Sequence, residues 1–462
     1  MATIGRPTHG VRRRDFLRAV GVGGGALALF GCDDDSGPRA DGDAEVLFWL
    51  PGGSDIFFTT HKEIASAFSK SNQGVKVRIH RHTGQQVFME VLLARIAAGN
   101  PPQAMVLWET PMSLAVRGSL TGLDEFMAAS ENSQENNWPE ALLASCQFEG
   151  QTYGLPFQAD SYALWYNQDW FEEKGIPADR DSFPKTWDEL RSLSKEFTRW
   201  KGDKLEAAGF IPGFLVGDPA EELPMWAASN GGQIFDAENQ RYVIDSESNV
   251  EMLEFFLSWL DEEYQGNIRK VAESGAWGAY PGEQGQPPAF QNQRLAMMLT
   301  GAWVMGDLYE VEPKFEHWNI ASIPVGPSGS EPTSGYWPNW LAIPAGVDNA
   351  EGAFAYLDHL SVDGALALYA TATGVPTNAN VAGGIAPSRV VEKRGEDFAK
   401  EATDFFRRQL DIATPMWNSP VQSFATDQLR RALEQVANKA VRPRAALAEA
   451  QRVCQAELES VL

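Results

Sequence analysis

Strands and helices alternate between residues 44 and 109, and this alternation constrains the fold more than any other feature of the sequence. Three apolar stretches of strand length, AEVLFWL, VKVRIH and AMVLW, are separated by two segments with helical periodicity. Ile64 and Phe68 lie one helical turn apart in the first helical segment, and the second ends in a glycine-proline stop. The pattern indicates an α/β domain with a largely parallel sheet.

Sheets of this kind bind ligands beyond the carboxyl ends of their strands. Trp49 lies at the carboxyl end of the first predicted strand, Ser54 follows that strand, and Glu109 follows the third. We therefore predict that all three contact a ligand. Two alternatives stay open, because a tryptophan at such a place can also pack in the core, and Glu109 can also cap a helix or lie on the surface.

Two amphipathic helices, each with a predicted capping box, lie in the middle of the chain. PKTWDELRSLSKEF contains Thr186 and Glu189, and SESNVEMLEFFLSWL contains Ser248 and Glu251 at the same spacing. Three later apolar stretches, RLAMMLTGAW, WNIASIP and NWLAIPA, predict strands. Roughly the last 80 residues predict mainly helices.

The N-terminal stretch RRRDFLRAVGVGGGALALFGC, residues 12–32, has the basic head and short apolar segment of a secretory signal. It is too short to span a bilayer, which takes about 20 apolar residues. Arg13 and Arg14 begin the sequence RRDFL, which resembles the twin-arginine export pattern R-R-x-F-L. This pattern indicates export in the folded state.

The sequence LFGC, which ends at Cys32, resembles a bacterial lipobox, whose cysteine receives a lipid and becomes the mature N-terminus. A cleaved signal with an accidental cysteine is the alternative. We predict a twin-arginine lipoprotein signal peptide at 1–31 and a disordered polar tether at 32–43. The protein would then be anchored by lipid alone to the outer face of the cytoplasmic membrane, which faces the periplasm in a Gram-negative cell.

Length and charge narrow the classes of protein further. Residues 1–31 contain five Arg and one Asp, so their removal changes the net charge from −24 to about −28. Such a surface repels nucleic acid, which is therefore not expected as a partner. About 430 mature residues exceed what one core supports, so we expect two domains or one bilobal body. Cys146 and Cys454 are expected in the core without a bridge between them.

Several phrases, read in order, resemble the extracellular solute-binding proteins of ABC importers, in the carbohydrate-binding family that includes maltose-binding protein. ARIAAGNPPQAMV resembles the family phrase A-x-G-x-x-P-D-hydrophobic, although Gln103 stands where the family usually has Asp. GQTYGLPFQADSYALWYNQDWFEEKGI and FPKTWDELRSLSKEF resemble the family's G-x-x-Y-G-x-P strand and P-x-T-W-x-E-L helix. The correspondence extends over nearly all of residues 45–380.

This resemblance implies a two-lobe α/β fold of the type II periplasmic-binding-protein kind, with hinge strands and a central ligand cleft. The N-terminal lobe would hold residues 44–158 with 341–376. The C-terminal lobe would hold residues 159–340 with 377–462. Ligand would lie in the cleft, and the lobes would close on it.

A sugar needs flat aromatic surfaces for its C–H faces and planar polar groups for its hydroxyls. The chain has 15 Trp, more than a core requires. Family members use aromatic residues at positions resembling 226, 303 and 337, and core packing is the alternative for these three. Residues 158 and 160 could contact the ligand, or they could instead hold the hinge strands together. The predicted ligand contacts are Trp49, Ser54, Glu109, Gln158, Asp160, Trp226, Asn230, Trp303, Trp337, Asn339 and Trp417.

The resemblance therefore implies a monomer that carries a neutral sugar or oligosaccharide to the permease subunits of an ABC transporter, without a cofactor. A ligand sensor, or a binding protein for another solute such as a glycerophosphodiester, is the alternative. An enzyme is less favoured, because the chain lacks G-x-S-x-G, H-E-x-x-H and a phosphate-binding loop. No metal is expected, since His80 and His82 form a pair without a third ligand.

Overall fold

The computed structural model describes residues 44–72, 74–216, 219–276, 288–371, 374–381, 386–415 and 419–462, which belong to one compact unit. Cys32, Arg13, Arg14, the predicted signal and the predicted tether lie outside the described residues, and so does Trp417. Among the helices of the described residues, none has the length and apolar character needed to cross a membrane.

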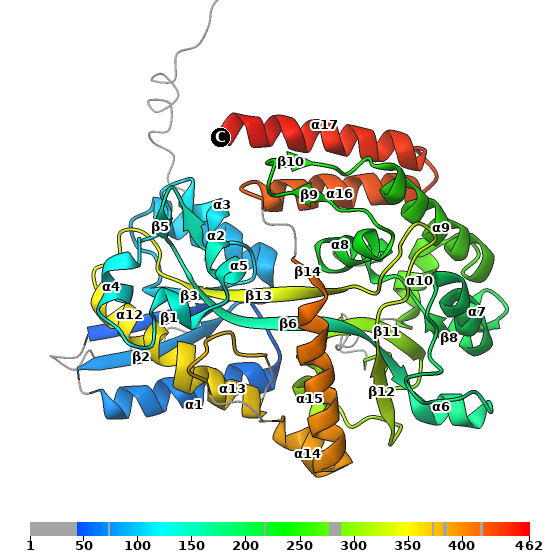
Figure 1. Ribbon diagram of the computed structural model, residues 1–462, viewed down its shortest axis with the longest axis horizontal. Helices are drawn as coiled ribbons and strands as arrows, with labels where there is room; N and C mark the ends of the chain where they lie inside the picture. The colour runs from blue at the N-terminus through cyan, green and yellow to red at the C-terminus, as the bar shows by residue number, and fades with distance from the viewer. Residues whose placement is uncertain are drawn as a thin grey trace, which may run out of the picture. The chain divides into compact units, whose positions relative to one another are not determined.

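The first part of the chain has the predicted alternation of strands and helices (Figure 1). Its elements are β1 (Ala44–Leu50), α1 (Asp55–Ser71), β2 (Val75–Arg81), α2 (Gln85–Ala97) and β3 (Ala104–Leu107). β1 pairs in parallel with β2 on one side and with β3 on the other. Its alternate side chains pack against α1 on one face and α2 on the other, which explains why the strand is apolar throughout.

Two long antiparallel strands, β6 (Leu155–Asn167) and β13 (Ser334–Ala342), lie at the middle of the main sheet (Figure 1). The sheet order is β2-β1-β3-β13-β6-β11-β8-β7. The strands beyond β6 are β11 (Leu295–Gly301), β8 (Lys204–Phe210) and β7 (Arg199–Lys201), and β12 (Trp318–Ala321) also pairs with β6. One sheet therefore runs without a break through both halves of the protein.

Buried apolar side chains gather on either side of these crossings. We call lobe 1 the part whose cores are drawn from residues 46–157 and 340–368. Lobe 2 is the part whose core is drawn from residues 162–323 and 390–458. Each lobe thus combines segments that lie far apart in the sequence, while the predicted residue boundaries of the lobes stay a prediction.

A further segment, which follows α13 (Ala365–Thr371), lies alongside β6. The Ala159 N–H donates to the Val375 carbonyl at 2.9 Å, and the Ala379 N–H donates to the Asn137 carbonyl of lobe 1 at 2.7 Å. Gly374 has a φ of +120°, and a Cβ there would lie 2.1 Å from the Gln158 side chain. Glycine is therefore favoured where this segment meets β6.

The last part of the chain is mainly helical, as predicted. Its helices are α14 (Ser388–Arg394), α15 (Glu396–Asp411), α16 (Gln422–Ala437) and α17 (Pro443–Val461). Figure 1 shows α15 running across β6 and β13, and the Ser161 hydroxyl donates to the Phe406 carbonyl of α15 at 2.6 Å. Cys146 and Cys454 are both buried free thiols.

The two predicted amphipathic helices are α7 (Trp187–Phe197) and α9 (Glu247–Glu263). The capping box of Thr186 and Glu189 is confirmed at the start of α7. The one predicted from Ser248 is wrong, because α9 begins two residues earlier, with Ser246 as its N-cap. Ser246 precedes the helix and its hydroxyl accepts from the Asn249 N–H at 3.3 Å.

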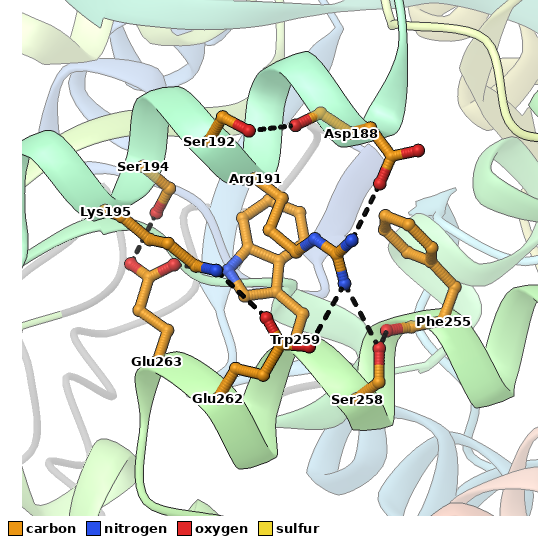
Figure 2. Close-up of polar contacts among 10 residues, drawn as sticks. All are labelled: Asp188, Arg191, Ser192, Ser194, Lys195, Phe255, Ser258, Trp259, Glu262 and Glu263. Atoms are coloured by element: carbon orange, nitrogen blue, oxygen red, sulfur yellow. Dashed lines mark hydrogen bonds and ion pairs between the residues drawn. The ribbon is translucent and has the colours of Figure 1, made fainter.

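A buried carboxylate joins these two helices (Figure 2). Glu263 is 8 % exposed and accepts hydrogen bonds from the Ser194 hydroxyl at 2.7 Å and from Trp259 Nε1 at 2.6 Å. The Thr198 hydroxyl is a third donor. Burial raises the pKa of Glu263, and the three donors offset part of that rise.

Candidate ligand-binding site

The turn between β1 and α1 forms the lobe 1 side of the predicted site. Gly53 has a φ of +103°, which favours glycine. A Cβ on Gly52 would lie 2.9 Å from the Trp108 ring, so this indole rests against the turn. Trp108 and Glu109 follow β3, and both are partly exposed. Trp108 was missed by the sequence analysis, although its place beside Glu109 at the same strand end was a usable signal.

The same turn is hydrogen-bonded to lobe 2. The Ser54 hydroxyl caps α1 by accepting from the Phe57 N–H at 3.2 Å, and it donates to Asp307 Oδ1 at 2.7 Å. The Ile56 N–H donates to Glu310 Oε1 at 2.6 Å. Both carboxylates are thus placed at the positive end of the α1 dipole. Asp307 and Glu310, which sequence reasoning also missed, link the lobes where the strands of lobe 1 end.

Glu109 contributes a further contact between the lobes. Its Oε2 accepts a hydrogen bond from the hydroxyl of Ser423, which lies in the first turn of α16. A carboxylate predicted to accept a ligand hydroxyl thus accepts a protein hydroxyl in this structure. Its side chain is partly exposed, so the contact lies at the surface of the lobe junction.

Two of the predicted tryptophans lie partly exposed on lobe 2. Trp303 follows β11, and a Cβ on Gly301 would lie 2.0 Å from its ring. The Trp303 ring also stands edge-on to Tyr162, with ring centres 5.1 Å apart. Trp337 lies on β13 opposite Asp160 of β6. Both indoles pack against the lobe 2 core on one side and keep exposed surface on the other.

Trp226 and Asn230 are fully buried in lobe 2. Trp226 Nε1 donates to Glu222 Oε2 at 3.1 Å. The Asn230 amide donates to Glu251 Oε2 at 2.9 Å and accepts from the Ser328 N–H at 3.0 Å. Trp226 thus has the packing role that the sequence left as the alternative to ligand contact, whereas Asn230, predicted to contact the ligand, is buried with protein partners.

Trp49 is 3 % exposed and lies under α2 in lobe 1. Its ring stands edge-on to His82, with centres 4.4 Å apart, and also packs on Phe88. This is the core placement that the sequence left open for Trp49.

Gln158 and Asp160, for which a hinge role stayed open, are buried, and so is Asn339. The Asn339 amide of β13 donates to Gln158 Oε1 of β6 at 3.2 Å. The Val375 N–H of the segment after α13 donates to Asp160 Oδ1 at 3.2 Å. Burial raises the pKa of Asp160 to about 7. For Gln158 and Asp160 these contacts correspond to the hinge alternative, because they join β6 to β13 and to the segment that follows α13.

The structure thus brings Ser54 and Glu109 of lobe 1 to the junction with lobe 2, and it leaves Trp303 and Trp337 partly exposed on lobe 2. This set offers aromatic surface together with carboxylate and hydroxyl groups. Such a combination suits a ligand with apolar faces and a rim of hydroxyls.

Comparison with known proteins gives a consistent classification. Residues 57–366 match the family model described as bacterial extracellular solute-binding protein. A putative binding protein of Brucella abortus is 24 % identical over 300 residues, which are 65 % of this chain and 67 % of that protein. The diacetylchitobiose binding protein DasA of Streptomyces coelicolor is 24 % identical over 240 residues, 50 % of this chain and 52 % of DasA.

Solved structures show the same fold. The GacH receptor of Streptomyces glaucescens, solved unliganded and with acarbose, has a TM-score of 0.72 at 21 % identity and covers 90 % of this chain and 99 % of its own. CpMnBP1 with mannotriose bound has a TM-score of 0.71 at 20 % identity, and the match covers 89 % of this chain and 99 % of CpMnBP1. The predicted two-lobe α/β fold is confirmed by this likeness.

Proposed function

The chain belongs to the bacterial extracellular solute-binding proteins, and from this premise we propose that it captures a neutral sugar or oligosaccharide between its lobes and delivers it to the permease of an ABC importer. The observation that carries the proposal is that lobe 2 keeps the indoles of Trp303 and Trp337 partly exposed, while Ser54 and Glu109 bring hydroxyl and carboxylate groups of lobe 1 to the junction with lobe 2. Relatives named for diacetylchitobiose, maltotriose and arabinooligosaccharide support the choice of ligand class.

The indoles of Trp303 and Trp337 would stack on the C–H faces of the sugar, which is the usual use of such surfaces. Glu109 and Asp307 would accept hydrogen bonds from hydroxyl groups of the ligand, because both already accept hydrogen bonds from serine hydroxyls. Asp160, Gln158 and Asn339 would act as hinge residues that set how the lobes close.

The charges near Ser54 favour a neutral ligand over a phosphodiester. Arg81 is the cation next to this turn, and it is paired with Asp55 at 2.8 Å and with the Ser54 carbonyl at 3.0 Å. Glu109, Asp307 and Glu310 add negative charge to the same junction. A phosphate would meet repulsion here, whereas sugar hydroxyls would meet acceptors.

A ligand stabilises the closed form only by the difference between its affinities for the two forms. A sugar that contacts Glu109 of lobe 1 as well as the indoles of lobe 2 gains its full set of contacts only on closure. Delivery would then follow when the permease reopens the lobes.

A thermal-shift screen of the full chain tests the proposal with mono-, di- and oligosaccharides, and with glycerophosphodiesters, peptides and polyamines as controls. A ligand at a hundred times its Kd stabilises by about 2.7 kcal/mol, which moves the melting temperature by degrees. A rise with one sugar class is expected. A rise with the controls alone would overturn the sugar assignment. Hydrolysis of the bound sugar would favour an enzyme, and unchanged uptake with lost signalling in a deletion strain would favour a sensor.

We also propose that the protein is exported by its twin-arginine signal and anchored through a lipid on Cys32. Replacement of Arg13 and Arg14 by Lys should leave precursor in the cytoplasm. Cys32→Ala should release the protein from washed membranes. Normal export of the first variant, or membrane retention of the second, would contradict the corresponding part of this proposal.

A further inference from the structure

One edge of β6 changes its partner at Asp160, in the middle of the crossing between the lobes. The Ala159 N–H donates to the Val375 carbonyl in the segment that follows α13, and this segment is hydrogen-bonded to lobe 1. Two residues further along the same edge, the Ala302 N–H of lobe 2 donates to the Ser161 carbonyl at 3.0 Å. Asp160 therefore lies where the partner of this strand edge changes from lobe 1 to lobe 2.

The Asp160 side chain lies on the face of the crossing that carries two of the proposed ligand contacts. Trp337 of β13 is its register partner, and directly opposite residues of antiparallel strands point to the same face. Tyr162 shares this face because it lies two residues further along β6, and its ring stands edge-on to Trp303. Ser161 points the other way, since its hydroxyl donates to α15. Asp160 thus faces the side on which the sugar is proposed to bind.

The carboxyl group of Asp160 is buried without a cation beside it. Asp160 is 3 % exposed, and no ion pair joins it to another side chain among the described residues. Its Oδ1 accepts one hydrogen bond, from the Val375 N–H at 3.2 Å. Burial of a carboxylate penalises its charged form, and one backbone donor offsets only part of that penalty. The pKa of Asp160 is therefore raised to about 7, so a change in its cover changes its charge near neutral pH.

The other titratable side chains around Asp160 are of kinds that hold their charge between pH 6 and 8. They are Tyr162 of β6, Tyr336 of β13, Tyr369 of α13, and Asp404 and Arg407 of α15. Burial raises the pKa of Tyr369, and the charge of Asp160 adds to that rise. The Arg407 guanidinium lies 5.9 Å from the centre of the Tyr369 ring, and the hydrogen bond from Lys400 lowers the pKa of Asp404. Neither β11 nor residues 374–377 contain a titratable side chain.

We propose that Asp160 is a positioning residue that couples proton binding to lobe closure, so that the closed form takes up a proton that the open form releases. The groups around its carboxyl belong to both lobes, since Val375 follows α13 of lobe 1 and Trp337 packs against the core of lobe 2. Separation of the lobes moves these groups apart and lets water reach the carboxyl. Its pKa then falls toward the ordinary value of about 4.

The direction of the effect follows from this difference between the two forms. A proton binds the closed form better, so it shifts the lobes toward closure and raises the affinity for any ligand that needs the closed form. This contribution is present below pH 7 and is lost as the pH rises through 7, because the closed form then has to release the proton. Where the proposal concerns the sugar, it rests on the proposed function.

Calorimetry of the full chain tests the coupling with the sugar found by the thermal-shift screen, at pH 6, 7 and 8 in two buffers of different ionisation enthalpy. The parent should take up a fraction of a proton per sugar, and its Kd should fall about threefold to tenfold from pH 8 to pH 6. Asp160→Asn keeps an acceptor for the Val375 N–H and cannot ionise, so its Kd should not change with pH. Asp203→Asn, whose parent side chain is 90 % exposed, should behave like the parent.

Small-angle X-ray scattering of the free chain gives a second test that does not depend on the solute. The radius of gyration of the parent should be smaller at pH 6 than at pH 8, and Asp160→Asn should have the smaller value at both. Equal radii of the parent at the two pH values, or a pH dependence that persists in Asp160→Asn, would overturn the proposal. A pH-dependent radius without a response to any sugar would uphold the coupling and overturn the proposed function. Circular dichroism melting at pH 6 checks that Asp160→Asn is folded.

Discussion

The Ser54 hydroxyl of lobe 1 donates a 2.7 Å hydrogen bond to Asp307 Oδ1 of lobe 2, across 253 positions in the sequence. The Ile56 N–H donates to Glu310 in the same region. Both hydrogen bonds join lobe 1 to lobe 2. In the lobe closure proposed above, they would add to the free energy that contacts with a ligand contribute.

Asp307→Ala should shift the lobes toward the open form and weaken sugar binding. A hydrogen bond to a charged group contributes about 1.5–3 kcal/mol, which corresponds to roughly a tenfold or greater loss of affinity. Small-angle X-ray scattering of the free chain and calorimetry with the sugar found by the screen measure both effects. Asp203→Asn is the control, since that side chain is 90 % exposed. Unchanged scattering and affinity in Asp307→Ala would show that the bond does not favour closure.

Trp303 and Trp226 should respond to truncation in opposite ways. Trp303→Ala should weaken sugar binding at least tenfold and cost less stability than Trp226→Ala, because only part of its ring is buried against the lobe 2 core. Trp226→Ala should instead cost about 3–5 kcal/mol of stability, because its ring is fully buried. Urea unfolding and calorimetry separate the two outcomes. Full affinity in Trp303→Ala would remove this residue from the proposed site.

Asp160 should make the protein less stable as the pH rises toward 9. Burial raises its pKa to about 7 in the folded protein, so the folded state holds a proton that the unfolded state releases above about pH 4. This contribution is present at low pH and is lost as the pH rises through 7. Asp160→Asn keeps an acceptor for the Val375 N–H and cannot ionise. The difference between the unfolding free energies of Asp160→Asn and the parent should therefore shift by about 2–3 kcal/mol in favour of the variant from pH 5 to pH 9.

His61 should have the opposite effect in acid. It is fully buried against Phe48 and Phe57, neither ring nitrogen has a partner in the described part of the chain, and burial lowers its pKa to about 3. Between about pH 6.5 and pH 3 the unfolded state therefore binds a proton at His61, whereas the folded state does not. The parent chain should lose about 2 kcal/mol between pH 8 and pH 5 from this group, and His61→Leu should not.

The contributions of Asp160 and His61 have opposite signs between about pH 4 and 6.5, so they offset each other in the parent protein. The unfolding free energy of each single variant should therefore change more with pH than that of the parent. Urea unfolding of the parent and both variants at several pH values measures this. Parallel curves for all three proteins would contradict both predictions.

Glu263 should be needed for the stability of lobe 2, as its position between α7 and α9 indicates (Figure 2). Glu263→Ala leaves the Ser194 and Trp259 donors buried without their acceptor, so it should cost about 3–5 kcal/mol. Glu262→Ala is a matched control on the next residue, whose side chain is 49 % exposed and pairs with Lys195 at the surface. It should change stability by less than about 1 kcal/mol. Equal losses in the two variants would contradict this assignment.

Local patterns predicted the elements well wherever a short stretch carries its own signal. The alternation from 44 to 109 became β1, α1, β2, α2 and β3, and the capping box at Thr186 is present. The start of α9 was missed because Ser246 and Ser248 both fit the cap pattern. Only the hydrogen bond that the Asn249 N–H donates to the Ser246 hydroxyl selects between them.

The sequence by itself determined the fold class and the family of this protein, because periodicity, caps and family phrases are local properties of the chain. Only the tertiary structure decided which tryptophans keep exposed surface. Trp226 and Trp303 both stand near glycines in similar sequence contexts, yet one is fully buried and the other is not. Likewise Asp307 and Glu310 gave no signal of their own, since their partners lie more than 250 positions away. Such contacts depend on how the long strands carry the chain from one lobe to the other, which no local pattern encodes.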